Sequence, residues 1–100
     1  MELNLSTISM KLLNVEKKLQ DTLPKMYKAE VEYNQKYYDL LLRSMGASAP
    51  AREADAKTQL KQDPIFDLYH NLKLDVKILW SEKETLTTIS SNLRSMTWQS

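Results

Sequence analysis

The sequence predicts an all-α protein: a long antiparallel helical hairpin with coiled-coil-like heptad seams that assembles into an oligomer. Two apolar series with a seven-residue period carry this prediction. The first consists of Leu5, Leu12, Leu19, Met26, Tyr33 and Leu40, and the second of Ile65, Leu72, Leu79, Leu86 and Leu93. A sustained repeat of this kind is typical of a helix that packs lengthwise against another helix. One glycine and three prolines in 100 residues leave little turn material for a multi-stranded sheet.

The first long helix is expected over about residues 5–45. Pro24 interrupts it, and because proline removes a backbone hydrogen bond and crowds the preceding turn, we expect a kink or a break there. The helix then consists of two roughly collinear segments, about 5–22 and 24–45. Gly46 is the only glycine of the chain, and it follows this helix where a left-handed cap is favoured.

A second long helix is expected over about residues 64–98. Asp63 can cap the free amides of its first turn, and Pro64 fits the first helical position because that amide has no intrahelical partner. The turn between the long helices falls at about 46–51. The segment of about 52–62 favours helix by composition but offers few apolar side chains, so it is either a solvated helical arm or a mobile connector. All of these elements belong to a single helical domain.

The residue types argue against an enzyme, and we predict no catalytic residue, metal site or cofactor. His70 is the only histidine and the chain has no cysteine, so His70 is expected on the helix surface. A glycine-rich phosphate loop is excluded by the single glycine. Asp75 and Glu82 lie on the predicted seam and are expected to be buried. They would meet Lys36, Arg43 or a tyrosine hydroxyl across the hairpin, or set the register of an oligomer.

The lack of cysteine fits a reducing cytoplasm. The first residues lack the basic and apolar blocks of a signal peptide, and no apolar stretch approaches the length needed to cross a membrane. We therefore expect a cytoplasmic protein (in the host cytoplasm if a phage encodes it) without membrane contact. The formal net charge is +1, from 14 basic and 13 acidic residues, so nucleic-acid binding would require a local patch.

Such a patch is predicted along the first helix, where Lys11, Lys18 and Lys25 recur every seven residues and tyrosines lie among them. Lysines that contact phosphates, beside rings on which bases stack, are what sequence-tolerant single-strand binding requires. The predicted nucleic-acid-binding residues are Lys11, Lys18, Lys25, Lys28, Lys36 and Tyr38. The alternative is that the tyrosines fill the core and interfaces beside ordinary surface lysines.

Self-association is predicted from the charges beside the first seam and from the second helix. In a parallel pair of first helices, Lys11 would face Glu16 of the neighbouring chain. Lys25 would likewise face Glu30, a pattern that favours like chains side by side. The alternative is a solvated face with scattered charge. An exposed tryptophan near the end of a helix, such as Trp98, suggests a partner surface. The predicted oligomer interface consists of Leu72, Leu79, Trp80, Leu86, Leu93 and Trp98.

One segment resembles a known family. Glu53, Lys57, Leu60 and Asp63 form the pattern E-x3-K-x2-L-x2-D directly before the second helix, and a helix rich in tyrosine and lysine lies upstream. Over about residues 25–98 the chain is similar to the UvsY-type recombination mediators of tailed phages, which load a RecA-like recombinase onto single-stranded DNA. The resemblance implies a ring-like homo-oligomer, single-strand binding, and contacts to a RecA-like recombinase and a single-strand binding protein.

These observations predict a phage-type DNA recombination accessory protein that binds single-stranded DNA as a homo-oligomer and assists recombinase loading. The alternative is a small helical protein-binding module, such as a phage-encoded inhibitor or a secreted hairpin effector, with no nucleic-acid binding. The row of lysines separates the two hypotheses, because DNA binding requires it and protein binding does not.

Overall fold

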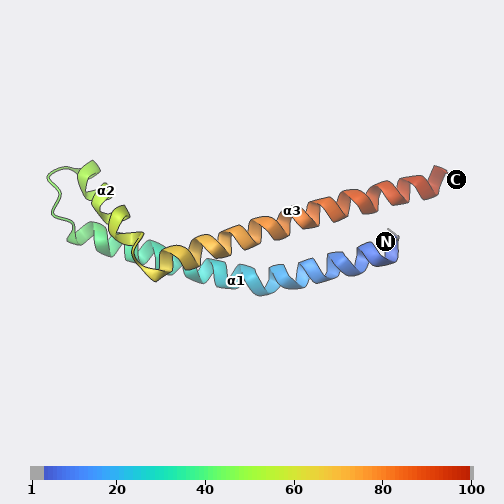
Figure 1. The fold of residues 1–100 in the computed structure, drawn as a ribbon, viewed down its shortest axis with the longest axis horizontal. Coiled ribbons are helices and arrows are strands. Elements are labelled where there is room, and N and C mark those ends of the chain that lie inside the picture. The colour runs from blue at the N-terminus through green and yellow to red at the C-terminus, as the bar shows by residue number, and fades with distance from the viewer. Residues whose placement is uncertain (1–3, 100) are drawn as a thin grey trace. The chain divides into compact units, whose positions relative to one another are not determined.

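The computed structural model of this protein describes the backbone of residues 4–99 and the side chains of residues 4–96. This part of the chain forms three helices and no strand (Figure 1). They are α1 (Leu5–Arg43), α2 (Ala49–Leu60) and α3 (Pro64–Gln99). The predicted all-α helical hairpin is confirmed: α1 and α3 are its long arms, and α2 lies in the connection between them.

Two helix starts show why the chain folds at these positions. Asp63 precedes α3, and its Oδ1 accepts a hydrogen bond of 2.9 Å from the backbone amide of Ile65, with Pro64 as the first helical residue. This is the cap that the sequence predicts. Ser48 does the same for α2, because its Oγ accepts from the amide of Ala51 at 3.3 Å.

Of the kink or break predicted at Pro24, the break is wrong, because α1 continues through this residue. The kink stays a prediction. Proline cannot donate to the carbonyl of Gln20, so one hydrogen bond of the helix is missing. Residues on both sides nevertheless stay in the packed seam: Leu19 and Ala29 are both buried. The chain does divide at this proline into two compact units, Met1–Leu23 with Asp75–Ser100 (unit 1) and Pro24–Leu74 (unit 2).

Unit 1 pairs the first part of α1 with the last part of α3 through an aliphatic seam. Its buried side chains are Ile8, Val15, Leu19, Val76, Leu79 and Leu86, together with Ser90. On the rim of this seam, the Glu16 carboxylate lies 3.7 Å from the Lys83 ammonium. Glu16, predicted to face Lys11 of a neighbouring chain, therefore has a partner within its own chain.

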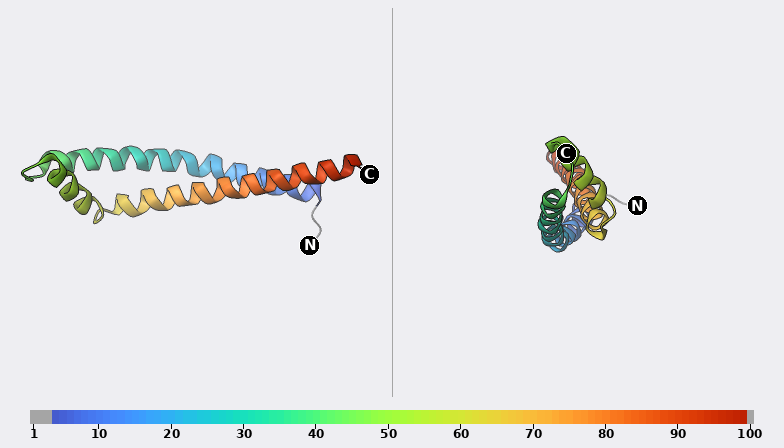
Figure 2. Two further views of the ribbon diagram at one scale, coloured as in Figure 1. Left: turned by 90° about the horizontal axis from the view of Figure 1, so that it is seen from above. Right: turned by 90° about the vertical axis from the view of Figure 1, so that its left-hand side faces the viewer.

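Unit 2 brings all three helices together, and α2 folds back beside the C-terminal turns of α1 (Figures 1 and 2). The core contains one buried residue from each helix: Ala29, Leu60 and Ile65.

Of the two interpretations of the segment at about 52–62, the solvated helical arm agrees with the structure, because α2 is a helix whose residues are mostly exposed. It is also anchored, since its Ala56 and Leu60 are 0% and 1% exposed. These two apolar side chains lie one turn apart and pack the helix against the hairpin, and the hydroxyl of Ser44 donates a hydrogen bond of 3.0 Å to the Asp55 carboxylate of α2.

Gly46 does not cap α1 in a left-handed conformation as predicted, since it has no positive φ. Its role is to permit a close approach between the turn and the start of α2. A Cβ atom at this position would lie 2.8 Å from the backbone nitrogen of Arg52 and 3.0 Å from the carbonyl carbon of Ala51. A side chain here would have to displace backbone atoms.

The acidic residues Asp75 and Glu82 are exposed, which corrects the prediction that they are buried. The reason is the drift of a 3.6-residue helix under a seven-residue repeat. Val76 and Leu79 occupy the seam at this point of α3, and a residue one place before Val76 is rotated about 100° away from it. Lys36, expected to meet these carboxylates, pairs with Asp63 instead.

Candidate functional site

The part of unit 2 around Tyr33 is a cluster of aromatic rings. The Tyr33 ring centroid lies 4.8 Å from that of Tyr69 and 6.4 Å from that of Phe66. His70 packs edge-on against Phe66, with the centroids 4.2 Å apart. The sequence predicts a surface histidine, but His70 is half-buried in this cluster. These rings join α1 to the first turns of α3.

Beside the cluster lies a groove of about 440 Å³ formed by all three elements of unit 2. Its lining residues are Tyr33, Asn34, Tyr37 and Tyr38 from α1, Lys57 and Lys61 from α2 and the residue after it, and Phe66 from α3. We call this feature the aromatic-basic groove. A volume of this size is within the range of small-molecule binding sites.

The basic wall of the groove is positioned by the packing of α2. Ala56 and Leu60 face the core, and the residue after each of them, Lys57 and Lys61, is rotated about 100° toward the groove. The two lysines are four residues apart and therefore on the same side of the helix. Within the described part of the chain, neither has a carboxylate within 4.0 Å. Both ammonium groups are available to an anion.

The opposite wall is aromatic. Tyr38 is exposed and meets Tyr37 edge-on at 5.7 Å between centroids. Asn34 is also exposed and adds an amide that can donate and accept hydrogen bonds. The lining residues include no histidine, cysteine or carboxylate, so the groove offers ring faces, an amide and positive charge. This combination is suited to binding a planar group that carries negative charge.

The structure brings only one of the six predicted nucleic-acid-binding residues, Tyr38, into this groove. Lys25 and Lys28 line a separate hollow of about 300 Å³ beside Leu68 and Leu72. Lys11 and Lys18 belong to unit 1. The predicted row of lysines is therefore not gathered into one site in either unit.

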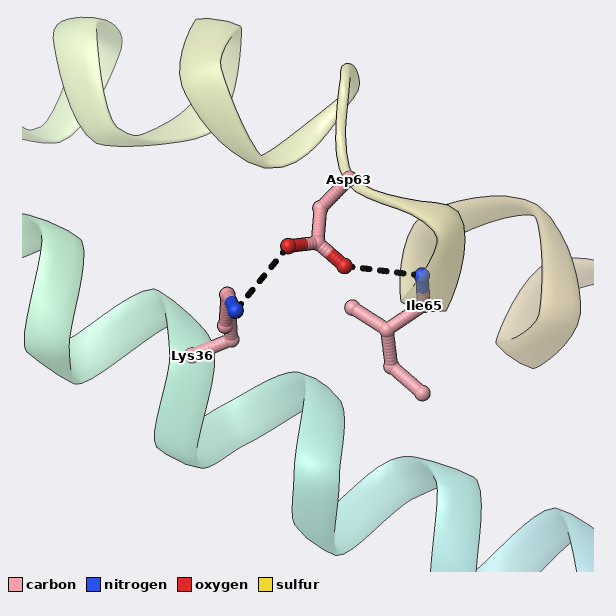
Figure 3. Close-up of polar contacts among 3 residues, drawn as sticks. All are labelled: Lys36, Asp63 and Ile65. Carbon is pink, nitrogen blue, oxygen red and sulfur yellow. Dashed lines mark hydrogen bonds and ion pairs between the residues drawn. The ribbon is translucent and has the colours of Figure 1, made fainter.

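Lys36 is engaged in the fold rather than free to bind a ligand. Its ammonium lies 3.1 Å from Oδ2 of Asp63, whose other oxygen caps α3 (Figure 3). The hydrogen bond from the Ile65 amide, together with the hydrogen bond and charge of Lys36, lowers the pKa of Asp63 below its ordinary value. This contact joins α1 to the start of α3.

Lys57 and Lys61 are the functional candidates that sequence reasoning missed. Their four-residue spacing in a segment with few apolar side chains could have identified a basic helix face. The sequence does not show that this basic face lies opposite Tyr37 and Tyr38, which are about twenty residues earlier in the chain.

Most of the predicted oligomer interface is used inside the chain. Leu79 and Leu86 are buried in the seam of unit 1, and Leu72 packs against the core of unit 2. Leu93 is half-buried, whereas Trp80 is exposed and has the Lys83 ammonium 5.0 Å from its ring centroid. The side chain of Trp98 lies outside the described residues.

Two further properties concern the described residues only. None of the helices between residues 4 and 99 has a stretch long and apolar enough to cross a membrane. No three histidine or acidic side chains in this range are grouped so that they could hold a metal ion.

Compared with protein-family models, with curated proteins and with solved structures, the chain matches none of them. The similarity to the UvsY-type mediators thus stays a hypothesis based on residue spacing.

Proposed function

We propose that this protein binds single-stranded nucleic acid as a homo-oligomer and acts as an accessory of DNA recombination that assists recombinase loading. The observation that supports nucleic-acid binding is the aromatic-basic groove, in which Lys57 and Lys61 face the rings of Tyr37, Tyr38 and Phe66. Bases can stack on such rings while lysines contact the adjacent phosphates. The recombination role rests on the UvsY-type resemblance and is a separate part of the proposal.

The affinity of one groove should be low, and it should increase when an oligomer presents several grooves to one strand. A base stacked on an aromatic side chain contributes about 1–3 kcal/mol. Two lysines can contact about two phosphates, and each contact changes the logarithmic salt slope by about −0.7 in single strands, so one groove predicts a slope of about −1.4. An oligomer presents several grooves to one strand and raises the apparent affinity without new contacts.

The test is a titration of labelled oligo-dT with the full chain, followed by fluorescence anisotropy at low and moderate salt. The double variant Lys57→Glu, Lys61→Glu should abolish binding, because it reverses both charges of the groove. The matched control is Lys73→Glu, Lys77→Glu, which makes the same charge change at the same spacing on α3 and should retain most of the binding. Wild-type-like binding by the groove variant, or no binding by the parent at low salt, contradicts the proposal.

A third variant pair separates the groove from the lysine row. Lys18→Glu, Lys25→Glu should weaken binding less than the groove variant does, because neither residue lines the groove. Tyr38→Ala should weaken binding and leave the salt slope unchanged, because stacking releases no ions. If the row variant alone abolishes binding, nucleic acid binds along α1 and not in the groove.

The second candidate function is a protein-binding helical module without nucleic-acid binding. The observation that favours it is the exposure of Leu42 and Met45 next to the turn, at 85% and 95%. Exposed apolar side chains that gather in one place are typical of a protein contact. A parent protein that leaves oligo-dT unbound at low salt makes this candidate the better account.

A further inference from the structure

The outer face of α1 in unit 2 carries a row of exposed side chains. Tyr27, Val31, Tyr38 and Leu42 are 57%, 56%, 61% and 85% exposed, and Asn34 lies among them on the same face. The steps of four, three, four and four residues keep all five within about 80° of the helix circumference. The buried Ala29 and the half-buried Tyr33 lie on the other side of the helix. We call these five residues (Tyr27, Val31, Asn34, Tyr38 and Leu42) the outer stripe.

Two pairs of apolar residues in the outer stripe are placed symmetrically about one point of the helix. Tyr27 and Leu42 are equally distant from the midpoint between Asn34 and Gln35, and Val31 and Tyr38 are equally distant from it as well. A two-fold interface between identical chains requires such self-complementarity: if residue i contacts residue j, then j contacts i. Each of these two pairs can therefore meet twice when two copies of the helix lie antiparallel.

We infer that the outer stripe binds the outer stripe of a second copy of this chain, with the two α1 helices antiparallel. Tyr27 then packs against Leu42 of the second copy, and Val31 packs against Tyr38. The Asn34 side chains meet near the two-fold axis, where a polar residue in an apolar seam fixes the register. The inference names the surface for the homo-oligomer in the proposed function and rests on that part of it alone.

The charges beside the stripe favour this arrangement. Lys28 and Asp39 are exposed and lie on the same flank of the outer stripe. Within one chain they are about 16 Å apart along the helix and cannot pair. In an antiparallel pair of helices like flanks meet, so Lys28 of each copy lies beside Asp39 of the other. On the opposite flank, Glu30 faces the uncharged Tyr37 and Leu41.

Dimerisation through the outer stripe also agrees with the surfaces that the folded chain leaves exposed. The leucines of the predicted oligomer interface close the hairpin itself, so assembly requires a different apolar surface. The outer stripe is about 22 Å long. A contact of this length along one helix buries less surface area than a standard protein interface, so we expect the dimer to dissociate at micromolar concentrations. Asn34 and Tyr38 belong both to the groove and to the outer stripe, so the dimer covers part of the groove wall on α1. Lys57 and Lys61 line the groove from α2 and the residue after it.

The first test measures mass by light scattering and sedimentation over a range of concentrations of the full chain. The parent should be a dimer at high micromolar concentration. Val31→Glu should raise its dissociation constant about tenfold or more, because it places a charge in the apolar contact. Leu74→Glu is the matched control: Leu74 is 55% exposed in the same unit, off the stripe, and this change should leave the mass unchanged. A monomeric parent, or a dimer indifferent to Val31→Glu, overturns the inference.

The second test examines direction and register. Lys28→Asp and Asp39→Lys should each weaken the dimer, and the double variant should restore it. The chain has no cysteine, so single cysteines report on neighbours without interference. Asn34→Cys should form a disulfide with itself, whereas Tyr27→Cys should do so only when mixed with Leu42→Cys. Self-coupling of Tyr27→Cys as readily as of Asn34→Cys indicates parallel helices and overturns the inference.

The two proposals fail separately in these experiments. The groove variant Lys57→Glu, Lys61→Glu should keep the mass of the parent, because neither lysine is among the five residues of the stripe. Loss of oligo-dT binding in a protein that still forms the antiparallel dimer contradicts only the nucleic-acid proposal. If Val31→Glu binds oligo-dT like the parent and also has the same mass as the parent, only the dimer proposal is contradicted.

Discussion

The two units of this protein join helices with different kinds of side chain. Unit 1 uses aliphatic residues such as Val15, Leu79 and Leu86, which are buried. Unit 2 uses a small core of Ala29, Leu60 and Ile65 and surrounds it with tyrosines and Phe66. Aliphatic side chains close a helical seam, whereas large rings with polar ends keep part of their surface in water and leave a groove. The candidate site therefore lies in unit 2.

The difference extends to how each unit depends on its surroundings. The seam of unit 1 is a two-helix contact that repeats along its length. Unit 2 needs α2 to complete its core, and α2 is held by two buried side chains, a Ser48 cap and a close turn at Gly46. Among the described residues, unit 2 thus has fewer buried side chains than unit 1, and the predictions below test this imbalance.

The largest effect is expected at Leu60, which is 1% exposed in the core of unit 2. Leu60→Ala should reduce the free energy of unfolding by about 2–5 kcal/mol, because it leaves a cavity where three helices meet. Hydrogen exchange should speed up in residues 24–74 and change little in unit 1. The matched change in unit 1, Leu86→Ala, should show the reverse. Equal loss of protection in both units from either variant contradicts a division into two units.

A smaller effect is expected at the turn before α2. Gly46→Ala should cost about 1–3 kcal/mol, because the new Cβ atom would lie 2.8 Å from the backbone nitrogen of Arg52. Thermal unfolding followed by circular dichroism measures the loss. Ala47→Ser changes the neighbouring exposed residue and should stay within about 0.5 kcal/mol of the parent. A parent-like Gly46→Ala protein shows that the turn can relax and that α2 is not held by this contact.

The smallest effect concerns the contact between Lys36 and Asp63. The pKa of Asp63 is lowered in the folded protein, so its carboxylate stabilises the fold above the ordinary pKa of aspartate. That contribution disappears as the pH falls through the lowered value. Asp63→Asn keeps a capping side chain without the charge, and its melting temperature should depend less on acid pH than that of the parent. Asp67→Asn, in the same first turn of α3, is the control and should follow the parent curve.

The sequence was sufficient for the features that depend on neighbouring residues. The seven-residue series predicts two long helices, and the Asp63–Pro64 pair predicts the start of α3, because caps and first-turn prolines act over only a few positions. It was insufficient where contacts come from distant parts of the chain. Composition describes α2 as poor in apolar residues, and only the fold shows that Ala56 and Leu60 meet a core.

The same limit explains the candidate site. Tyr38 was predicted from the tyrosines and lysines that lie near one another on a single helix. Lys57 and Lys61 join Tyr38 only because α2 folds back onto α1, and helical periodicity has no information about that contact. For the same reason Lys36 was assigned to a ligand, although its partner Asp63 lies 3.1 Å away in the folded chain.

The uneven placement of aromatic residues gives each unit its own natural fluorophore. All five tyrosines fall between residues 24 and 74, whereas both tryptophans, Trp80 and Trp98, fall after residue 74. Excitation at the red edge of the absorption band therefore reports on unit 1 alone, while tyrosine emission reports on unit 2. A single denaturant titration of the unlabelled wild-type chain, read in both channels, shows whether the two halves melt together or one after the other.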